Sequence, residues 1–275
     1  MAKSGNAPTG YYSSTQVMRK LGIGSSTLQH FVKTGKIKRI VPPHMRDGYY
    51  AQEEVDKMAK EKELFLLTYS KDTTQFSKAT EEDLVGIYEV GHDLWGNRTQ
   101  SYEARLNSYL KNPFIYYVVK KQGIIVGYLG LIPFKKEARD KLLAEPQTHF
   151  YLTYEKMLKE PDEILTFIPR EPIDSLSLEI AVKQGTPRGS LYGMRLIQGG
   201  LTVMEELAKQ GTIIKKLDAS SSSPDGIKIC RDMGFTELPP LPDTTRLRFE
   251  LDLETTTNPL IKNYQLLVKQ AEPLK

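Results

Sequence analysis

The sequence predicts an α+β protein of two domains, a small basic helical module followed by a larger body that mixes helices and strands. The chain has 275 residues with 39% hydrophobic content, which is enough for one large core and a small module. Its charge is unevenly divided. The first 50 residues hold eight basic side chains and one acidic, net +7, so the remainder holds 30 and 33, net −3. We place the domain boundary between residues 63 and 64.

The composition excludes several classes of protein. A single cysteine, Cys230, rules out an internal disulfide framework. The longest apolar run, IIVGYLGLIPF, is shorter than the roughly 20 residues that cross a bilayer. No basic-then-apolar leader stands at the amino end, so we expect a cytoplasmic protein without a membrane partner. The four histidines lack metal-ligand spacing, and we therefore expect no metal site.

The basic module reads as two short helices joined by a tight turn. Ser13 or Ser14 can cap the first helix and Gly22 ends it; Ser25 or Ser26 can cap the second, which ends at Gly35. The chain then passes through KIKRIV, a Pro-Pro bend, a basic tip HMRDG, a returning YYA and the polar helix QEEVDKMAKEKE.

This run resembles the winged helix-turn-helix of MerR-like and excisionase-like DNA-binding domains. The similarity lies in the LGIGSSTL turn, the TGKI exit and the YYAQEEV return. It implies DNA as a partner, and good sites for this architecture are usually paired, so a homodimer is a candidate assembly. A recognition helix needs short polar or basic side chains facing outward, although any one of them alone could equally be a solvated surface residue. The candidate contacts are Ser26, Thr27, Gln29, His30 and Lys33 on the helix, with Arg39, His44 and Arg46 on the wing.

The body alternates helical and strand patterns in a definite order. Two helices, ATEEDLVGIYEVGHDLWG and SYEARLNSYLKN, precede a hairpin around KKQG and a long, partly helical insertion. The alternating strand DSLSLEIAV then leads through KQGTPRGSLYG into a helix from Met194 that ends at Gly211. The strand TIIKKLDAS, the helix IKICRDMGF and the strand TRLRFELDL follow, and a short helix is expected around residues 260–268.

The turn between the strand and the Met194 helix has the features of an anion site. Backbone N–H groups at the start of a helix have no partner within it, and the helix dipole favours negative charge there. Arg188 offers a phosphate partner, while Gly189 and Gly193 allow close backbone approach. The alternative is an ordinary connecting turn, which is what most glycine-bearing turns are.

The order of elements in the body resembles that of GNAT-type N-acetyltransferases. The loop that starts at Arg188 and the helix-end signature Met233-Gly234-Phe235 carry the resemblance, but Leu191 replaces the middle glycine of the loop. The resemblance implies a mixed, mostly antiparallel sheet flanked by helices, with acetyl-CoA as cofactor and an amine as acceptor. It further implies that backbone groups of Ile180 and Val182 hold pantetheine and that the pyrophosphate meets Arg188, Gly189, Ser190, Leu191, Tyr192 and Gly193.

Two residues are candidates for proton transfer. Glu179 is the candidate base, because the strand period places it opposite the apolar face; the alternative is a solvent-facing or cross-strand charge. Cys230 occupies a position where the family often has a tyrosine acid, although a lone cysteine is more often a core residue. Three functions remain open: an acetyltransferase fused to a DNA-binding module, a regulator that senses acyl-CoA without turnover, and a DNA-binding protein whose body is an interaction platform.

Overall fold

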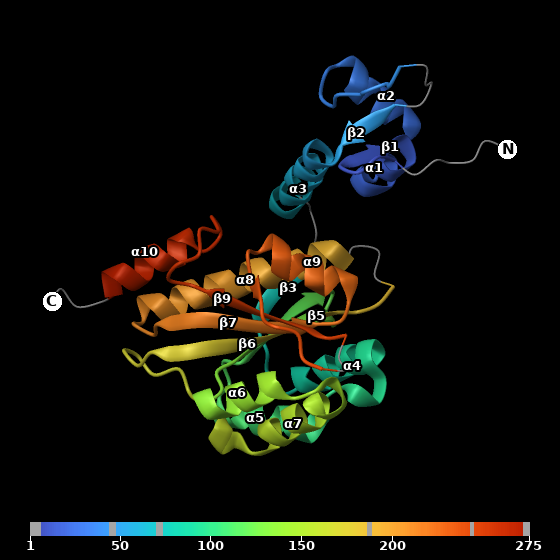
Figure 1. The fold of residues 1–275 in the computed structure, drawn as a ribbon. Coiled ribbons are helices and arrows are strands. Elements are labelled where there is room, and N and C mark those ends of the chain that lie inside the picture. The colour runs from blue at the N-terminus through green and yellow to red at the C-terminus, as the bar shows by residue number, and fades with distance from the viewer. Residues whose placement is uncertain (1–6, 44–47, 70–73, 186–188, 243–244, 272–275) are drawn as a thin grey trace. The chain divides into compact units, whose positions relative to one another are not determined.

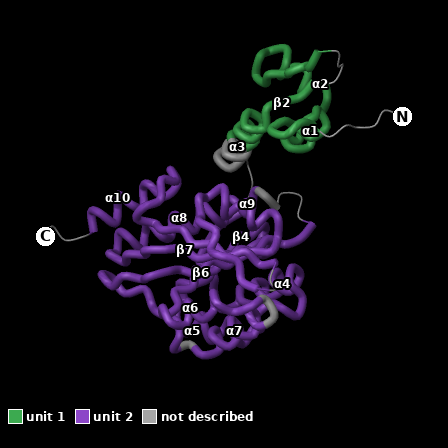
Figure 2. Tube along the Cα trace, in the orientation of Figure 1, with its two compact units in different colours: residues 1–72 green, residues 73–275 purple. Residues whose placement is uncertain are grey.

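The computed structural model describes residues 7–43, 48–69, 74–185, 189–242 and 245–271. The chain forms two compact units, Met1–Asp72 and Thr73–Lys275 (Figure 2). The position between residues 63 and 64 falls inside a helix of the first unit, α3 (Gln52–Tyr69). The helix predicted over QEEVDKMAKEKE therefore continues past these polar residues to Tyr69.

The first unit has a two-stranded sheet and three helices. Strands β1 (Tyr11–Ser13) and β2 (Tyr49–Ala51) pair antiparallel, and helices α1 (Ser14–Leu21) and α2 (Ser25–Lys33) precede α3. The returning YYA segment thus pairs with the start of the chain, and an isolated bridge links it to the KIKRIV segment. Its small core consists of Val17, Leu21, Leu28, Ile37, Tyr50 and Val55.

The ends of the first two helices follow local rules, with one exception. Of the two predicted caps, Ser13 is the N-cap of α1 and Ser14 is already helical; the Ser13 hydroxyl accepts from the Gln16 N–H while the Gln16 side chain accepts from the Ser13 N–H. Gly22, at φ 57°, ends the helix as expected. The predicted cap of α2 was wrong: the N-cap is Gly24, and Ser25 is already the first helical residue.

The second unit contains a seven-stranded sheet in the order β3-β4-β5-β6-β7-β9-β8. All neighbours pair antiparallel except β6 and β7, which are parallel. This confirms the expected α+β class with a mixed, mostly antiparallel sheet. The strands are β3 (Thr74–Lys78), β4 (Tyr116–Lys121), β5 (Ile124–Ile132), β6 (Ile173–Val182), β7 (Ile214–Ser221), β8 (Thr236–Glu237) and β9 (Leu247–Asp252).

Helices flank both faces of this sheet (Figure 1). One face is covered by α4 (Asp83–Trp95), α5 (Tyr102–Lys111), α6 (Lys136–Ala144) and α7 (Gln147–Lys159), with the short 3-10 turns Gly96–Arg98 and Pro161–Glu163. The other face is covered by α8 (Gly189–Lys209) and α10 (Lys262–Ala271), and α9 (Pro224–Asp232) packs against β7. Each face of the sheet buries its own hydrophobic cluster. Leu176 of β6 belongs to the cluster under α8, and Ala181 of the same strand belongs to the cluster under α4.

Several local predictions for this unit are confirmed. The hairpin turns through Gln122 and Gly123, both with positive φ, which is the two-residue geometry that matches strand twist. The insertion forms α6 and α7, and the expected C-terminal helix is α10. Neither edge strand, β3 nor the two-residue β8, was predicted. Within the described residues, no helix is both long and apolar enough to cross a membrane.

Candidate functional site

The parallel strands β6 and β7 stay paired for only part of their length. Their register runs from Ile173 and Ile214 to Ser177 and Asp218. Beyond that point β7 remains paired with β9 as far as Ser221, and β6 remains paired with β5. In the described part of the chain, residues 178–182 of β6 therefore have a strand partner on one side only. We call these residues the open edge of β6.

The hydrogen bonds of β6 decide which backbone groups reach the open edge. The N–H of Lys183 donates to the Val126 carbonyl at 2.9 Å, and the register between β5 and β6 continues from there to Glu179 without a break. Successive residues of a strand direct their backbone groups to opposite edges. The N–H and C=O groups of Ile180 and Val182 consequently point away from β5, into the open edge.

Helix α8 begins close to the end of β6 in sequence. Its first residue is Gly189 and not Met194 as predicted, so residues 189–193 form the first turn of the helix instead of a loop. The first four N–H groups of any helix lack partners within it. An added Cβ at Gly193 would meet only Val182 Cγ2, at 3.9 Å. Internal packing therefore does not require glycine at this position, and the first turn offers unobstructed backbone on the side of β6.

The other residues predicted for the loop divide into two groups. Tyr192 is 1% exposed and Leu191 is half-buried, and both side chains pack in the core under α8. Only their backbone groups could therefore meet a phosphate. Arg188 and the side chain of Ser190 lie outside the described residues, and their assignment stays a prediction.

Glu179 lies in a buried polar cluster on the α4 side of the sheet. Its Oε1 accepts from Arg105 Nη2 at 3.0 Å and from the Tyr128 hydroxyl, and its Oε2 accepts from the Tyr154 hydroxyl at 2.9 Å. Glu179 is 8% exposed and Arg105 is fully buried. The solvent-facing alternative is therefore wrong, because this face of β6 is covered by helices and the carboxylate is held by three donors.

The charge state of this cluster follows from its burial. Burial opposes ionisation of Arg105, but the adjacent Glu179 carboxylate raises the pKa of the guanidinium well above its ordinary value. Burial, reinforced by the same carboxylate, raises the pKa values of Tyr128 and Tyr154 well above 10. Both phenols stay protonated at neutral pH and act as donors. Among the described residues, Nε and Nη1 of Arg105 have no hydrogen-bond partner.

A second polar cluster lies where β6 and β7 separate. Asp218, the last residue of β7 that pairs with β6, is 1% exposed and forms an ion pair with Arg139 of α6. Arg139 also reaches Glu250 of β9, and the Ser175 hydroxyl bonds to Asp218. Burial raises the pKa of Asp218, and Arg139 opposes that change. The cluster ties the inserted helix α6 to the sheet beside the open edge.

Cys230 is a buried residue of α9. It is 7% exposed, and burial raises the pKa of its thiol to about 11. A thiol in such surroundings is unreactive unless its environment changes. These observations favour the core-residue interpretation, while a role as acid stays a prediction.

The predicted DNA contacts lie mostly on one face of α2. Ser26, Gln29, His30 and Lys33 are exposed, whereas Thr27 is half-buried at the flank of that face. Arg39 is also exposed. The wing residues His44 and Arg46 lie outside the described residues.

Sequence reasoning missed the partners of Glu179. Arg105, Tyr128 and Tyr154 come from α5, β5 and α7, and they lie 74, 51 and 25 residues from Glu179 along the chain. No motif links such distant positions. The one available signal was Arg105 itself, an arginine on the inward face of an amphipathic helix.

No known family model matches this chain, and no curated protein matches it. Solved structures do match. An acetyltransferase of the GNAT family from Bacillus cereus is 18% identical over 66% of this chain and 97% of its own, with a TM-score of 0.39. The loading GNATL domain of CurA from Lyngbya majuscula is 14% identical over 66% and 98%, with a TM-score of 0.48. A Salmonella typhimurium protein assigned as an acetyltransferase, solved with acetyl-CoA, is 15% identical over 68% and 98%, with a TM-score of 0.43. At this level of similarity, the function of this chain has to be inferred from its own residues.

Proposed function

We propose that the second unit binds acetyl-CoA along the open edge of β6 and transfers the acetyl group to an amine. The observation that carries the proposal is the end of the β6–β7 register at Ser177 and Asp218, which leaves backbone groups of Ile180 and Val182 without a strand partner. Both residues are half-buried, and backbone N–H and C=O groups of a strand bond to another strand, a side chain, water or a ligand. An amide-rich ligand such as the pantetheine arm would satisfy them.

The first turn of α8 would hold the pyrophosphate. Its free N–H groups and the positive end of the helix dipole favour an anion. Gly193 supports this role, because the protein's own packing leaves room there for a Cβ. The order of elements implied by the GNAT resemblance, with α8 following β6 directly, supports the same assignment.

Glu179 would receive the proton from the amine. The bound thioester supplies an activated acetyl group, so the protein has to orient the amine and accept its proton as the nitrogen bonds to the carbonyl carbon and the sulfur leaves. Oε1 of Glu179 already accepts two hydrogen bonds, whereas Oε2 accepts one. A carboxylate oxygen has two acceptor sites, so Oε2 is the atom that retains capacity for the proton.

A second candidate function is acyl-CoA sensing without turnover. The observation that favours it is the neutralisation of Glu179 by a fully buried arginine, combined with the burial of Cys230. Glu179 is engaged in a buried ion pair with Arg105, and a thiol with its pKa raised to about 11 makes Cys230 a poor proton donor to a leaving thiolate. Binding and turnover must therefore be tested separately.

Binding is tested by thermal unfolding of the second unit. A ligand at 100 times its dissociation constant stabilises the folded state by about 2.7 kcal/mol, which raises the melting temperature of a domain of this size by about 5–10 °C. ATP at the same concentration is the control for a general anion effect. No shift with acetyl-CoA would leave the platform interpretation of this unit standing.

Turnover is tested by release of free thiol from acetyl-CoA in the presence of a panel of amines. Release that falls strongly in Glu179→Gln, with acetyl-CoA binding retained, supports an enzyme with Glu179 as base. Binding without release in the wild type supports the sensor. Release at the wild-type rate in Glu179→Gln would remove Glu179 as the base.

We further propose that the first unit binds DNA through α2. The support is its net charge of +7 over 50 residues and the exposed polar face that includes His30 and Lys33. The full protein would then be an acetyl-CoA-dependent transcriptional regulator. Binding to duplex DNA should weaken steeply with salt; affinity that ignores salt would contradict this assignment.

A further inference from the structure

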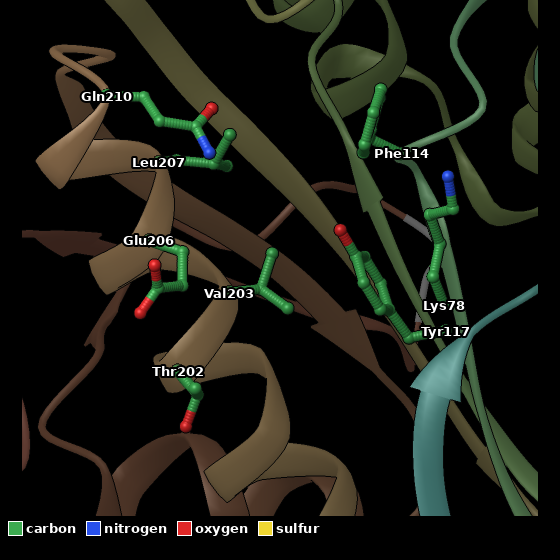
Figure 3. A pocket seen from close by; sticks show the side chains of 8 residues that line it. All are labelled: Lys78, Phe114, Tyr117, Thr202, Val203, Glu206, Leu207 and Gln210. Carbon is green, nitrogen blue, oxygen red and sulfur yellow. The ribbon is translucent and has the colours of Figure 1, made fainter.

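A pocket lies at the edge of the second unit's sheet, between β4 and the C-terminal half of α8. Its volume is about 260 Å³. Figure 3 shows Tyr117 and Phe114 on one side and Val203 and Leu207 of α8 on the other. Lys78, the last residue of β3, lies at its rim. We call it the edge pocket.

The edge pocket is distinct from the open edge of β6. Val203 lies 14 residues after Gly189 on α8, which corresponds to about 21 Å along the helix axis. A ligand that fits within the edge pocket would therefore not reach the first turn of α8. Nothing in the proposed acetyl transfer requires the edge pocket.

One polar group of a largely buried side chain faces the open space of the pocket. Tyr117 is 6% exposed, and its ring is held by stacking on Phe76 at 5.6 Å between centroids. In the described part of the chain its hydroxyl has no hydrogen-bond partner, and it points toward the space beside Val203 (Figure 3). Burial raises the pKa of Tyr117 to about 12, so the hydroxyl is a donor at neutral pH.

The pocket is lined by one lysine and one glutamate, and only the glutamate has an ion-pair partner among the described residues. Lys78 has no carboxylate partner among the described residues, and its ammonium sits 4.3 Å from the centroid of the Phe114 ring. Glu206 also lines the pocket, but its carboxylate is paired with Lys209 at 2.7 Å. The uncompensated charge at the mouth is therefore positive, next to an apolar interior with one free hydroxyl donor.

We propose that the edge pocket binds a small carboxylic acid with an aromatic or branched apolar body. The apolar part would lie between Tyr117 and Val203, where removal of its surface from water favours binding. The carboxylate would meet the Lys78 ammonium and accept from the Tyr117 hydroxyl, a donor that the described residues leave available to a ligand. The volume admits one ring or a short branched chain, which is less than a drug-sized ligand occupies.

Calorimetric titration with phenylacetate as the probe tests this assignment, with phenylacetamide as the uncharged analogue. Wild-type protein should bind phenylacetate more tightly than the amide. Lys78→Met keeps the apolar stem and should weaken phenylacetate about fivefold, the effect of one partly exposed ion pair, while the amide is unaffected. Lys121→Met, an exposed lysine on the neighbouring strand that does not line the pocket, is the matched control and should change neither.

Val203→Phe fills the pocket and should abolish binding of both probes, with folding checked by the melting temperature. Absence of binding in the wild type at millimolar phenylacetate, or an equal affinity of wild type and Lys78→Met for it, would overturn the proposal. Competition by acetyl-CoA would also overturn it by placing the probe in the other site. A dimer that Val203→Phe dissociates in sedimentation would assign the pocket to a second copy instead.

Discussion

Replacing Arg105 by methionine should destabilise the second unit by about 3 kcal/mol. Removal of one partner from a buried ion pair costs about 3–5 kcal/mol, because the other charge stays buried without compensation. Two features place Arg105→Met at the lower end of this range of destabilisation. Tyr128 and Tyr154 still donate to Glu179, and the variant removes Nε and Nη1 of Arg105, which lack partners and are costly when buried.

The assay is urea unfolding followed by the fluorescence of Trp95, the only tryptophan of the chain, which lies in α4. It therefore reports the second unit and not the first. The matched control is Arg231→Met. Arg231 forms an ion pair with Glu237 at 2.9 Å but is 60% exposed, so its loss should cost less than about 1 kcal/mol.

The double variant Arg105→Met with Glu179→Gln separates charge burial from packing, because a glutamine amide can still bond to the Tyr128 and Tyr154 hydroxyls. Removing both charges leaves no uncompensated ion, so the double variant should recover most of the lost stability. Arg105→Met with a cost no larger than that of Arg231→Met would refute the reasoning. A double variant less stable than Arg105→Met alone would refute it as well.

Three further predictions follow from single observations. Gly193→Ala should leave stability unchanged or higher, since its Cβ meets only Val182 at 3.9 Å, but should weaken acetyl-CoA binding about tenfold, or 1.4 kcal/mol, by calorimetry; unchanged affinity would contradict the pyrophosphate assignment. Because burial raises the pKa of Cys230 to about 11, iodoacetamide should label the native protein slowly at neutral pH and faster as the pH approaches that value or after unfolding. Labelling is measured by mass spectrometry, and rapid labelling of the native protein at neutral pH would contradict the buried-thiol interpretation. Lys33→Ala with Arg39→Ala should reduce the salt slope of DNA binding by about 0.9 per lost phosphate contact, and an unaltered slope in fluorescence anisotropy would remove them as contacts.

Local signals made most of the fold predictable. The cap at Ser13, the two-residue turn at Gln122 and the alternation of β6 each depend on neighbouring residues, and all three are present. The exceptions are local ambiguities. Gly24 rather than Ser25 or Ser26 caps α2, and α8 starts at Gly189 instead of Met194. The edge strands β3 and β8 are short and were not predicted.

The surroundings of Glu179 were not predictable from local patterns. The strand period correctly placed it opposite the apolar face with Leu176, but periodicity does not say whether that second face meets water or other helices. The insertion that forms α7 brings Tyr154 over this face, and α5 brings Arg105. Tertiary packing alone joins these residues.

Amide hydrogen exchange, resolved by residue and measured with and without acetyl-CoA, tests the open edge of β6 most directly. The N–H groups of Ile180 and Val182 point away from β5, so acetyl-CoA should slow their exchange, together with that of the first turn of α8. The N–H groups of Glu179 and Ala181 already face β5 and should change little. Protection of all four amides alike, or of none, would contradict the account.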